Sequence, residues 1–154
     1  MIAMKETLLF TDELKEDELT HFAQQLLPEL KKSEPFCLVL EGPLGIGKTS
    51  LSRHVLQGLG LSEKEPVVSP TYSYLNEYQI GKDYYAHCDL YRLESLELLN
   101  DELEVCLLRK FKGYLIEWPK LRGQEGLLEP THKLRIDPVK DLKNKRKYSF
   151  YSFT

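Results

Sequence analysis

The residue types most able to do chemistry lie close together near the first third of the chain. Gly42, Gly47, Lys48 and Thr49 match the pattern G-x-x-x-x-G-K-[ST], with Gly45 inside the loop. Such glycines let backbone N–H groups turn toward phosphate oxygens, and the following helix points its positive end at them. Lys48 would reach the β and γ phosphates of a nucleotide, and the Thr49 hydroxyl would be an oxygen ligand for Mg²⁺. We therefore expect a phosphate site formed by Gly42, Gly45, Ile46, Gly47, Lys48, Thr49 and Ser50.

Two carboxylates stand where apolar runs end. Glu117 closes "YLIE" and Asp89 closes "YYAHCD". Carboxyl ends of parallel strands meet at one edge of a sheet, which would bring both acids to the glycine loop. Glu117 would contact Mg²⁺ directly or through water, and Asp89 would help to bind the metal or orient an attacking water. A strand-end acid is more often a cap or a solvated residue, so neither acid alone carries the hypothesis.

Three further residues lie near these strand ends. Thr71 follows a proline that favours extended backbone, and its hydroxyl could meet the γ-phosphate as a switch residue; the alternative is an ordinary strand start. His87 is expected to face away from Asp89, as a buried or partner-facing histidine rather than a general base. Trp118, the only tryptophan, is either a core residue or a contact residue for a partner.

The elements that must position these residues can be read from the apolar pattern. The run "FCLVLEG" at 36–42 is typical of a strand buried on both faces. Residues 48–60 carry Leu51, Val55 and Leu56 on one side of a helix that Gly60 is placed to end. The order of strand, glycine loop and helix is the one that a phosphate site requires.

The flanking segments complete the predicted fold. "ETLLF" at 6–10 predicts a short strand, with Thr11 or Asp12 capping a helix whose apolar face runs from Leu14 to Leu30 and which Pro28 ends or kinks. Segments predicted further along the chain are an antiparallel hairpin over 71–93, one or two short helices over 93–111, a buried strand over 113–118, and a final hairpin from 132–139 and 146–153 that covers the sheet edge.

Together these elements predict an α/β fold, a single-domain P-loop NTPase fold over residues 1–154 with a mixed parallel and antiparallel sheet flanked by helices. Hydrophobic residues make up 42% and charged residues 29%, an ordinary globular balance. No apolar run approaches the length of a membrane span, so we expect a cytoplasmic protein. Cys37, Cys88 and Cys106 have no metal-ligand spacing and are expected to be reduced, the first two as buried thiols.

A net charge of −3 argues against binding nucleic acid over the whole surface, because such binding needs many cations against phosphates. The exception is the basic segment 140–147, "KDLKNKRK". It could meet RNA or an acidic partner, although a solvated loop between two strands is the more frequent explanation of such a run.

Four motifs occur in a fixed order: "GPLGIGKTS", "VVSPTYSYLNEY", "HCDLYRL" and "LIEWPK". Their order and approximate spacing resemble those of the TsaE family, also called YjeE, the small bacterial ATPases of tRNA threonylcarbamoyladenosine biosynthesis. The resemblance spans residues 36–119 well and the termini more loosely. The glycine loop is shared with many proteins, whereas the combination of the other three motifs is much more specific.

The resemblance implies roles for single residues. Thr49 and Glu117 look like the family's Mg²⁺ ligands, Gly45 to Thr49 like its ATP phosphate cradle, and Thr71 like its switch residue. Asp89 looks like an acid needed for turnover, and Trp118 is similar to the family tryptophan. TsaE proteins bind the TsaD and TsaB pair and use ATP hydrolysis to reset that complex, so tRNA would be reached only through the complex. We expect a monomer when the protein is free.

The chain departs from the family pattern at two loop positions, Pro43 and Ile46. Pro43 removes one N–H and Ile46 is β-branched at a tight position, so loop rigidity or phosphate affinity would differ. The basic residue with which the family closes over the nucleotide has Lys145 or Arg146 as candidates, and Thr11 is a candidate near the base.

Two other functions fit the same loop. A small-molecule kinase would add an arginine-bearing lid, and the scattered Arg109, Arg122 and Arg135 form no obvious lid cluster. A nucleotide-dependent scaffold would bind ATP and change partner affinity with negligible turnover. A GTPase fits less well, because "NKRK" at 144–147 lacks the acid that pairs with guanine.

Overall fold

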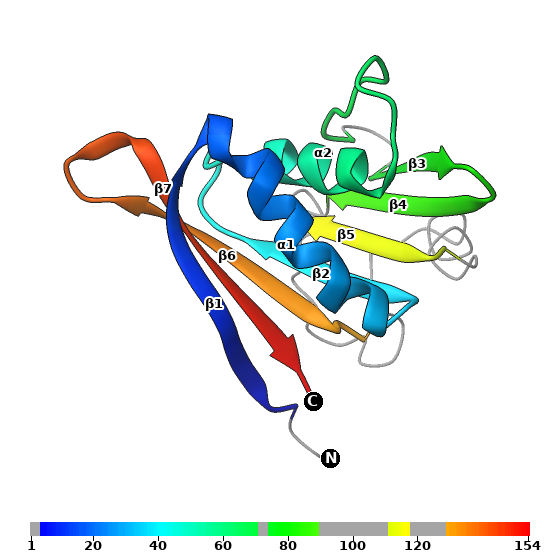
Figure 1. Ribbon diagram of the computed structural model, residues 1–154, viewed down its shortest axis with the longest axis horizontal. Coiled ribbons are helices and arrows are strands. Elements are labelled where there is room, and N and C mark those ends of the chain that lie inside the picture. The colour runs from blue at the N-terminus through cyan, green and yellow to red at the C-terminus, as the bar shows by residue number, and fades with distance from the viewer. Residues whose placement is uncertain (1–3, 71–73, 90–110, 118–128) are drawn as a thin grey trace.

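The computed structural model describes residues 4–70, 74–89, 111–117 and 129–154, and it has an α/β fold (Figure 1). Thr71, Trp118, Cys106 and nearly all of the predicted helical segment 93–111 lie outside the described residues. The elements in chain order are β1 (Glu6–Lys15), the 3-10 helix η1 (Glu16–Glu18), α1 (Leu19–Lys32), β2 (Phe36–Glu41), α2 (Lys48–Leu59), β3 (Leu75–Ile80), β4 (Asp83–Asp89), β5 (Gly113–Glu117), β6 (His132–Val139) and β7 (Leu142–Phe153).

The described strands form one seven-stranded sheet in the order β1-β7-β6-β2-β5-β4-β3. Strands β6, β2, β5 and β4 run parallel to one another. The outer strands are antiparallel to the strands they pair with: β3 to β4, β7 to β6, and β1 to β7. The prediction of a mixed sheet is therefore confirmed. The central strand β2 is buried along nearly its whole length, as its unbroken apolar run predicts.

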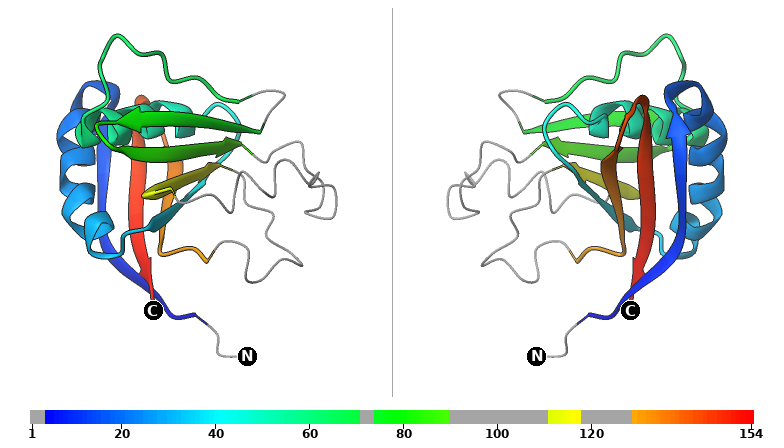
Figure 2. Two further views of the ribbon diagram at one scale, coloured as in Figure 1. Left: turned by 90° about the vertical axis from the view of Figure 1, so that its right-hand side faces the viewer. Right: turned by 90° about the vertical axis from the view of Figure 1, so that its left-hand side faces the viewer.

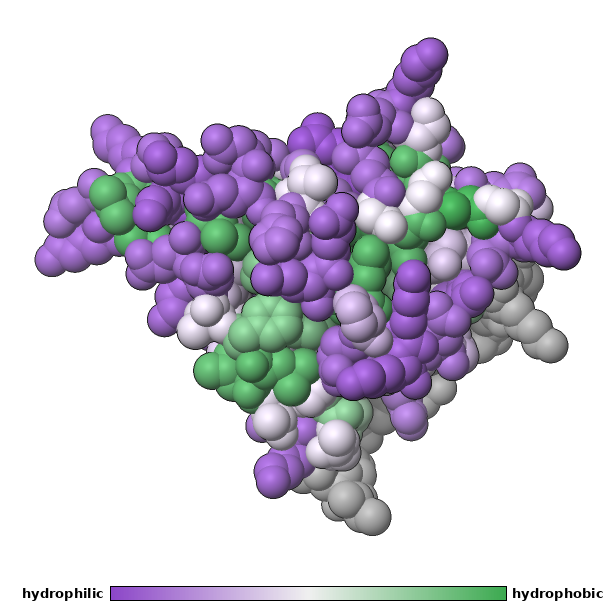
Figure 3. Space-filling view, in the orientation of Figure 1, coloured by the Kyte–Doolittle hydropathy of each residue, from purple (hydrophilic) through white to green (hydrophobic). Residues whose placement is uncertain are grey.

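The helices α1 and α2 lie on the same face of the sheet (Figure 2). Apolar side chains of α1 at helical spacing are all buried against the sheet and α2, namely Leu19, Phe22, Ala23, Leu26, Leu27 and Leu30. The outward side of α1 is mostly hydrophilic in the space-filling view (Figure 3). Because each helix buries one face, α2 is held over the middle of the sheet. The first residues of α2 are therefore held there as well.

The N-terminal predictions need correction. The first strand does not end at residue 10 but runs to Lys15, so Thr11 is a mid-strand residue rather than a cap, and Leu14 belongs to the strand. Its pairing with β7 extends the strand, since Leu14 lies opposite Arg146. Pro28 does not end the helix: α1 continues to Lys32, because buried apolar residues on both sides of the proline hold the helix to the core.

The two predicted hairpins form, and the second lies elsewhere than expected. The β3–β4 hairpin is confirmed. The β6–β7 hairpin is also confirmed, but it does not cover the sheet edge, because β1 pairs with the outer side of β7. The basic segment 140–147 is mostly strand rather than loop: the turn takes Lys140 and Asp141, and β7 begins at Leu142. The hairpin tip projects from the body (Figure 1).

Cys37 and Cys88 are buried free thiols, as predicted. Burial raises the pKa of Cys37 to about 12 and also raises the pKa of Cys88, so both thiols remain protonated near neutral pH. Within the described part of the chain, no helix is long and apolar enough to cross a membrane.

Candidate functional site

The glycine loop joins the end of β2 to the start of α2, and two of its positions require glycine. Gly47 caps α2 with φ of +119°, a left-handed conformation that a side chain rarely adopts, and its carbonyl accepts the Leu51 N–H at 3.0 Å. A Cβ atom at Gly42 would lie 2.7 Å from the Ile136 carbonyl oxygen. The loop can therefore pass close to β6 and enter the helix directly.

Lys48 lies inside the loop that precedes it. The residue is only 4% exposed, and its Nζ donates to the carbonyl oxygens of Gly42 at 2.8 Å and Pro43 at 3.0 Å. Burial lowers the pKa of Lys48, while the nearby carboxylates of Glu117 and Asp89 act in the opposite direction. The ammonium is thus held by the loop, beside two acids.

Glu117 and Asp89 end neighbouring parallel strands and are register partners. Glu117 is buried, with 3% of the residue exposed, and the Thr49 hydroxyl donates to its carboxylate at 3.1 Å from each oxygen. The Asp89 carboxylate accepts a hydrogen bond from the Ser69 hydroxyl at 2.5 Å. The structure therefore brings both predicted acids together with the first residues of α2.

The predicted orientation of His87 is wrong. Its side chain is fully buried, and its Nε2 lies 2.5 Å from Oε2 of Glu117. Residues two positions apart in a regular strand share a face, so His87 is on the same side of β4 as Asp89. The prediction that His87 is buried is correct, but its ring points to the acidic end of β5.

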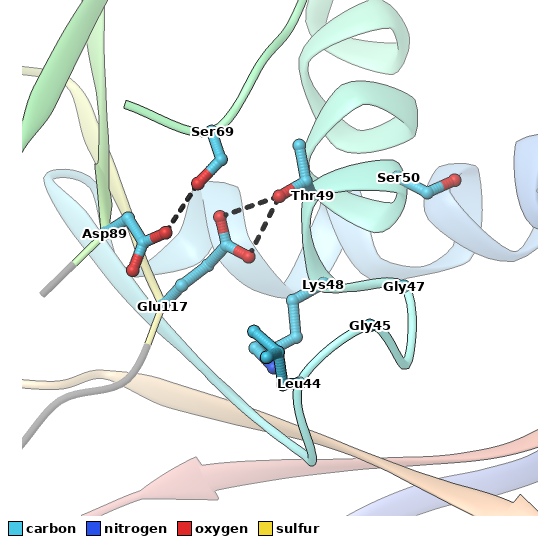
Figure 4. Close-up of a pocket in the computed structure, with 9 residues that line it drawn as sticks. All are labelled: Leu44, Gly45, Gly47, Lys48, Thr49, Ser50, Ser69, Asp89 and Glu117. Carbon is cyan, nitrogen blue, oxygen red and sulfur yellow. Dashed lines mark hydrogen bonds between the residues drawn. The ribbon is translucent and has the colours of Figure 1, made fainter. Parts of the chain in front are cut away.

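A pocket of about 260 Å³ opens between the loop, the start of α2 and the strand ends (Figure 4). Predicted residues that line it are Gly45, Gly47, Lys48, Thr49, Ser50, Asp89 and Glu117. Sequence reasoning missed Leu44 and Ser69 as lining residues. Ser69 could have been found, because it stands in the same S-P-T motif that pointed to Thr71.

Several predicted residues lie apart from the lining. The Ile46 side chain packs against the core, and its N–H donates to the Pro43 carbonyl, while Gly42 sits behind the loop against β6. Thr11 is on β1, where its hydroxyl pairs with Ser149. Lys145 and Arg146 are on β7 opposite β1 and do not line the pocket.

The oxygen atoms at the strand ends fit a hard divalent cation. The Thr49 hydroxyl and the Glu117 carboxylate touch, and Asp89 is next along the edge. Among the residues that the structure describes, no group of three or more His, Cys, Asp or Glu could hold a metal ion by itself. Mg²⁺ commonly uses one or two protein oxygens together with phosphate oxygens and water, so the few oxygen donors of this pocket are enough for its protein ligands.

Known proteins resemble the chain over most of its length. The family model described as "Threonylcarbamoyl adenosine biosynthesis protein TsaE" matches residues 14–148. The tRNA threonylcarbamoyladenosine biosynthesis protein TsaE of Haemophilus influenzae is 39% identical over 127 residues, which are 80% of this chain and 75% of that protein.

Two further proteins extend the comparison. The TsaE protein of Nostoc sp. is 50% identical over 68 residues, and this match spans 44% of the present chain and 41% of the Nostoc protein. The crystal structure of YdiB from Bacillus subtilis superposes with a TM-score of 0.63 at 23% identity, over 99% of this chain and 88% of that one. The structural match supports the fold.

Proposed function

Because this chain belongs to the TsaE family of threonylcarbamoyl adenosine biosynthesis proteins, we propose that it binds ATP in the pocket between α2 and the ends of β4 and β5 and hydrolyses it there. A protein of this family takes part in forming threonylcarbamoyladenosine in tRNA. We further propose that hydrolysis resets a partner complex of TsaD and TsaB between rounds of modification, with tRNA reached only through that complex.

Binding of the triphosphate is assigned to the loop and the start of α2. Backbone N–H groups around Gly45 and Gly47 and the positive end of α2 favour phosphate oxygens. Lys48 already lies among the loop carbonyls, and a phosphate would replace those weak neutral acceptors with charged ones. Ser50, in the first turn of α2, lines the same pocket and adds a polar side chain at the start of the helix.

The metal role is assigned to Thr49 and Glu117. Mg²⁺, when bound, supplies positive charge to the β and γ phosphates and offsets the charge that develops during transfer. The Thr49 hydroxyl, which now donates to Glu117, offers its own lone pairs to a cation. Glu117 offers a carboxylate that is nearly excluded from bulk water.

Asp89 is assigned to the attacking water. Its carboxylate lines the pocket and is held by the Ser69 hydroxyl, so it can accept a hydrogen bond from water and orient that water toward the γ-phosphate. Thr71 is proposed as the γ-phosphate switch and Trp118 as a contact residue for the partner complex; both lie outside the described residues.

The observation that carries this proposal is the Thr49–Glu117 contact beside a buried Lys48. It is tested by measuring Mg²⁺-dependent ATP hydrolysis for wild type and Glu117→Gln, which removes the charge but keeps the shape and a hydrogen-bond acceptor. We expect retained ATP binding and lost hydrolysis in the variant. Equal hydrolysis by the two proteins would refute the metal role.

The same experiment separates the other two functions. A small-molecule kinase would transfer the γ-phosphate of labelled ATP to an added acceptor rather than to water. A nucleotide-dependent scaffold would bind ATP with negligible turnover even when TsaD and TsaB are present. Release of labelled inorganic phosphate that rises on addition of these partners is the outcome that we expect.

A further inference from the structure

We infer that His87 is a positioning residue: its buried Nε2–H fixes the Glu117 carboxylate in the orientation that the metal site requires. The inference rests on the proposed function, because it concerns the acid to which a metal role is assigned. It adds a residue that neither the glycine loop nor the strand-end acids identify.

The geometry of the pair carries the argument. Nε2 of His87 lies 2.5 Å from Oε2 of Glu117, and the two side chains are 0% and 4% exposed. A carboxylate only accepts hydrogen bonds, so the hydrogen of this contact belongs to Nε2 of the imidazole. A buried carboxylate needs several donors to offset its lost hydration, and His87 supplies one besides Thr49, from the strand next to β5.

The Thr49 hydroxyl cannot orient the Glu117 carboxylate in this way. It is 3.1 Å from both Glu117 oxygens, and it has one hydrogen, so it can serve either oxygen and does not define the rotation of the carboxylate. The contact of His87 is with Oε2 only. His87 therefore distinguishes the two oxygens and restricts the rotation of the carboxylate.

The second ring nitrogen supports a dedicated role. Nδ1 of His87 is buried and has no hydrogen-bond partner among the described residues. If the ring at this position only filled space, an apolar side chain would make the fold more stable, because an unpaired buried polar atom costs free energy. Imidazole and carboxylate partners behind a metal ligand act by orienting that ligand.

Two amide variants provide a matched test. His87→Gln places an amide N–H near the position of Nε2, whereas His87→Asn is too short to reach Glu117 and places its amide near Nδ1. Binding of a fluorescent ATP analogue is titrated with MgCl₂ for wild type, both amides and His87→Leu, with folding checked by circular dichroism. We expect the Asn and Leu variants to need about 10- to 100-fold more Mg²⁺, and the Gln variant to stay near wild type.

The outcomes separate the inference from the proposed function. If wild-type binding ignores Mg²⁺, the metal role itself fails. If wild type depends on Mg²⁺ and all variants respond as wild type does, His87 has no positioning role and the inference is overturned. Should the Asn and Leu variants fail to fold, nitrogen NMR of labelled histidine in the wild type decides: a proton on Nε2 supports the inference, and a proton on Nδ1 alone overturns it.

Discussion

Asp89 and Glu117 are register partners at the ends of β4 and β5, and each carboxylate has a different hydroxyl donor. Ser69 donates to Asp89, and Thr49 donates to Glu117. The two acids are therefore adjacent in the sheet, and each accepts a hydrogen bond from a hydroxyl of a different segment. In the proposed reaction, Glu117 serves the metal and Asp89 orients the water.

Ser69→Ala should lower ATP turnover about tenfold with little change in KM, because Asp89 loses a hydrogen bond to a charged group, worth about 1.5–3 kcal/mol, without losing its charge. Asp89→Asn should cost more, about 10²- to 10⁴-fold, since it removes the acid itself. Steady-state kinetics with saturating Mg²⁺ checks both. Ser62→Ala in an exposed loop is the control, and equal turnover by the two serine variants would contradict the role of Ser69.

Lys48→Ala should weaken ATP binding by roughly 10- to 100-fold, because a buried ammonium in the phosphate loop is lost. Lys64→Ala removes an exposed lysine outside the pocket and should leave the affinity unchanged. Calorimetric titration with ATP measures both affinities. A similar loss in the two variants would mean that net charge, rather than the loop, governs binding.

Gly42→Ala should destabilise the fold by about 3 kcal/mol, because the added methyl group meets the backbone carbonyl of Ile136, which cannot move aside. Gly81→Ala is the matched control: its φ is also positive, at +61°, but nothing lies within 4 Å of the new atom. It should cost only about 1 kcal/mol. Urea unfolding of both variants checks the difference, and equal losses would show that the close approach to β6 is unimportant.

His132 should make stability depend on pH. Burial lowers the pKa of His132, while Glu29 on α1, with Oε1 3.8 Å from Nε2, acts in the opposite direction; the ring also contacts Thr131 and stacks on Phe150. The pKa of His132 in the folded state lies below its unfolded value of about 6.5. Its full contribution to stability is therefore present above about pH 6.5. Stability then falls as pH decreases toward the folded pKa, since the unfolded chain binds the proton more readily.

The check is the free energy of unfolding at about pH 7.5 and about pH 5.5 for wild type and His132→Phe. The variant keeps an aromatic ring against Phe150 and should lose less stability on acidification. A residual loss is expected from His54, whose pKa is also lowered, first by burial and then by Arg53. An unchanged pH dependence in the variant would contradict the assignment to His132.

The sequence predicted the parts of the fold that are locally encoded. The strand, loop and helix around Lys48 follow from an apolar run, glycine spacing and helical periodicity. The strand-end acids follow from their position directly after an apolar run. The end of β1 could not be predicted, because residues 11–15 are largely exposed and polar and become a strand only by pairing with β7.

His87 was placed on the wrong face and Ser69 was missed, and the reasons differ. The side of β4 on which His87 lies can be predicted, because two residues that are two positions apart in one strand share a face. Its contact with Glu117 depends on β4 and β5 being neighbours, which no local pattern specifies. Ser69 likewise meets Asp89 only through the fold.

The most direct test of the central claim is repeated threonylcarbamoylation of tRNA by TsaD and TsaB, with either wild type or Glu117→Gln added and ATP hydrolysis followed in the same reaction. We predict many rounds of modification with the wild type and about one round with the variant, with hydrolysis rising only in the first case. Multiple rounds with the variant, or hydrolysis that ignores the partners while modification is unchanged, would contradict the proposal that this pocket resets the complex.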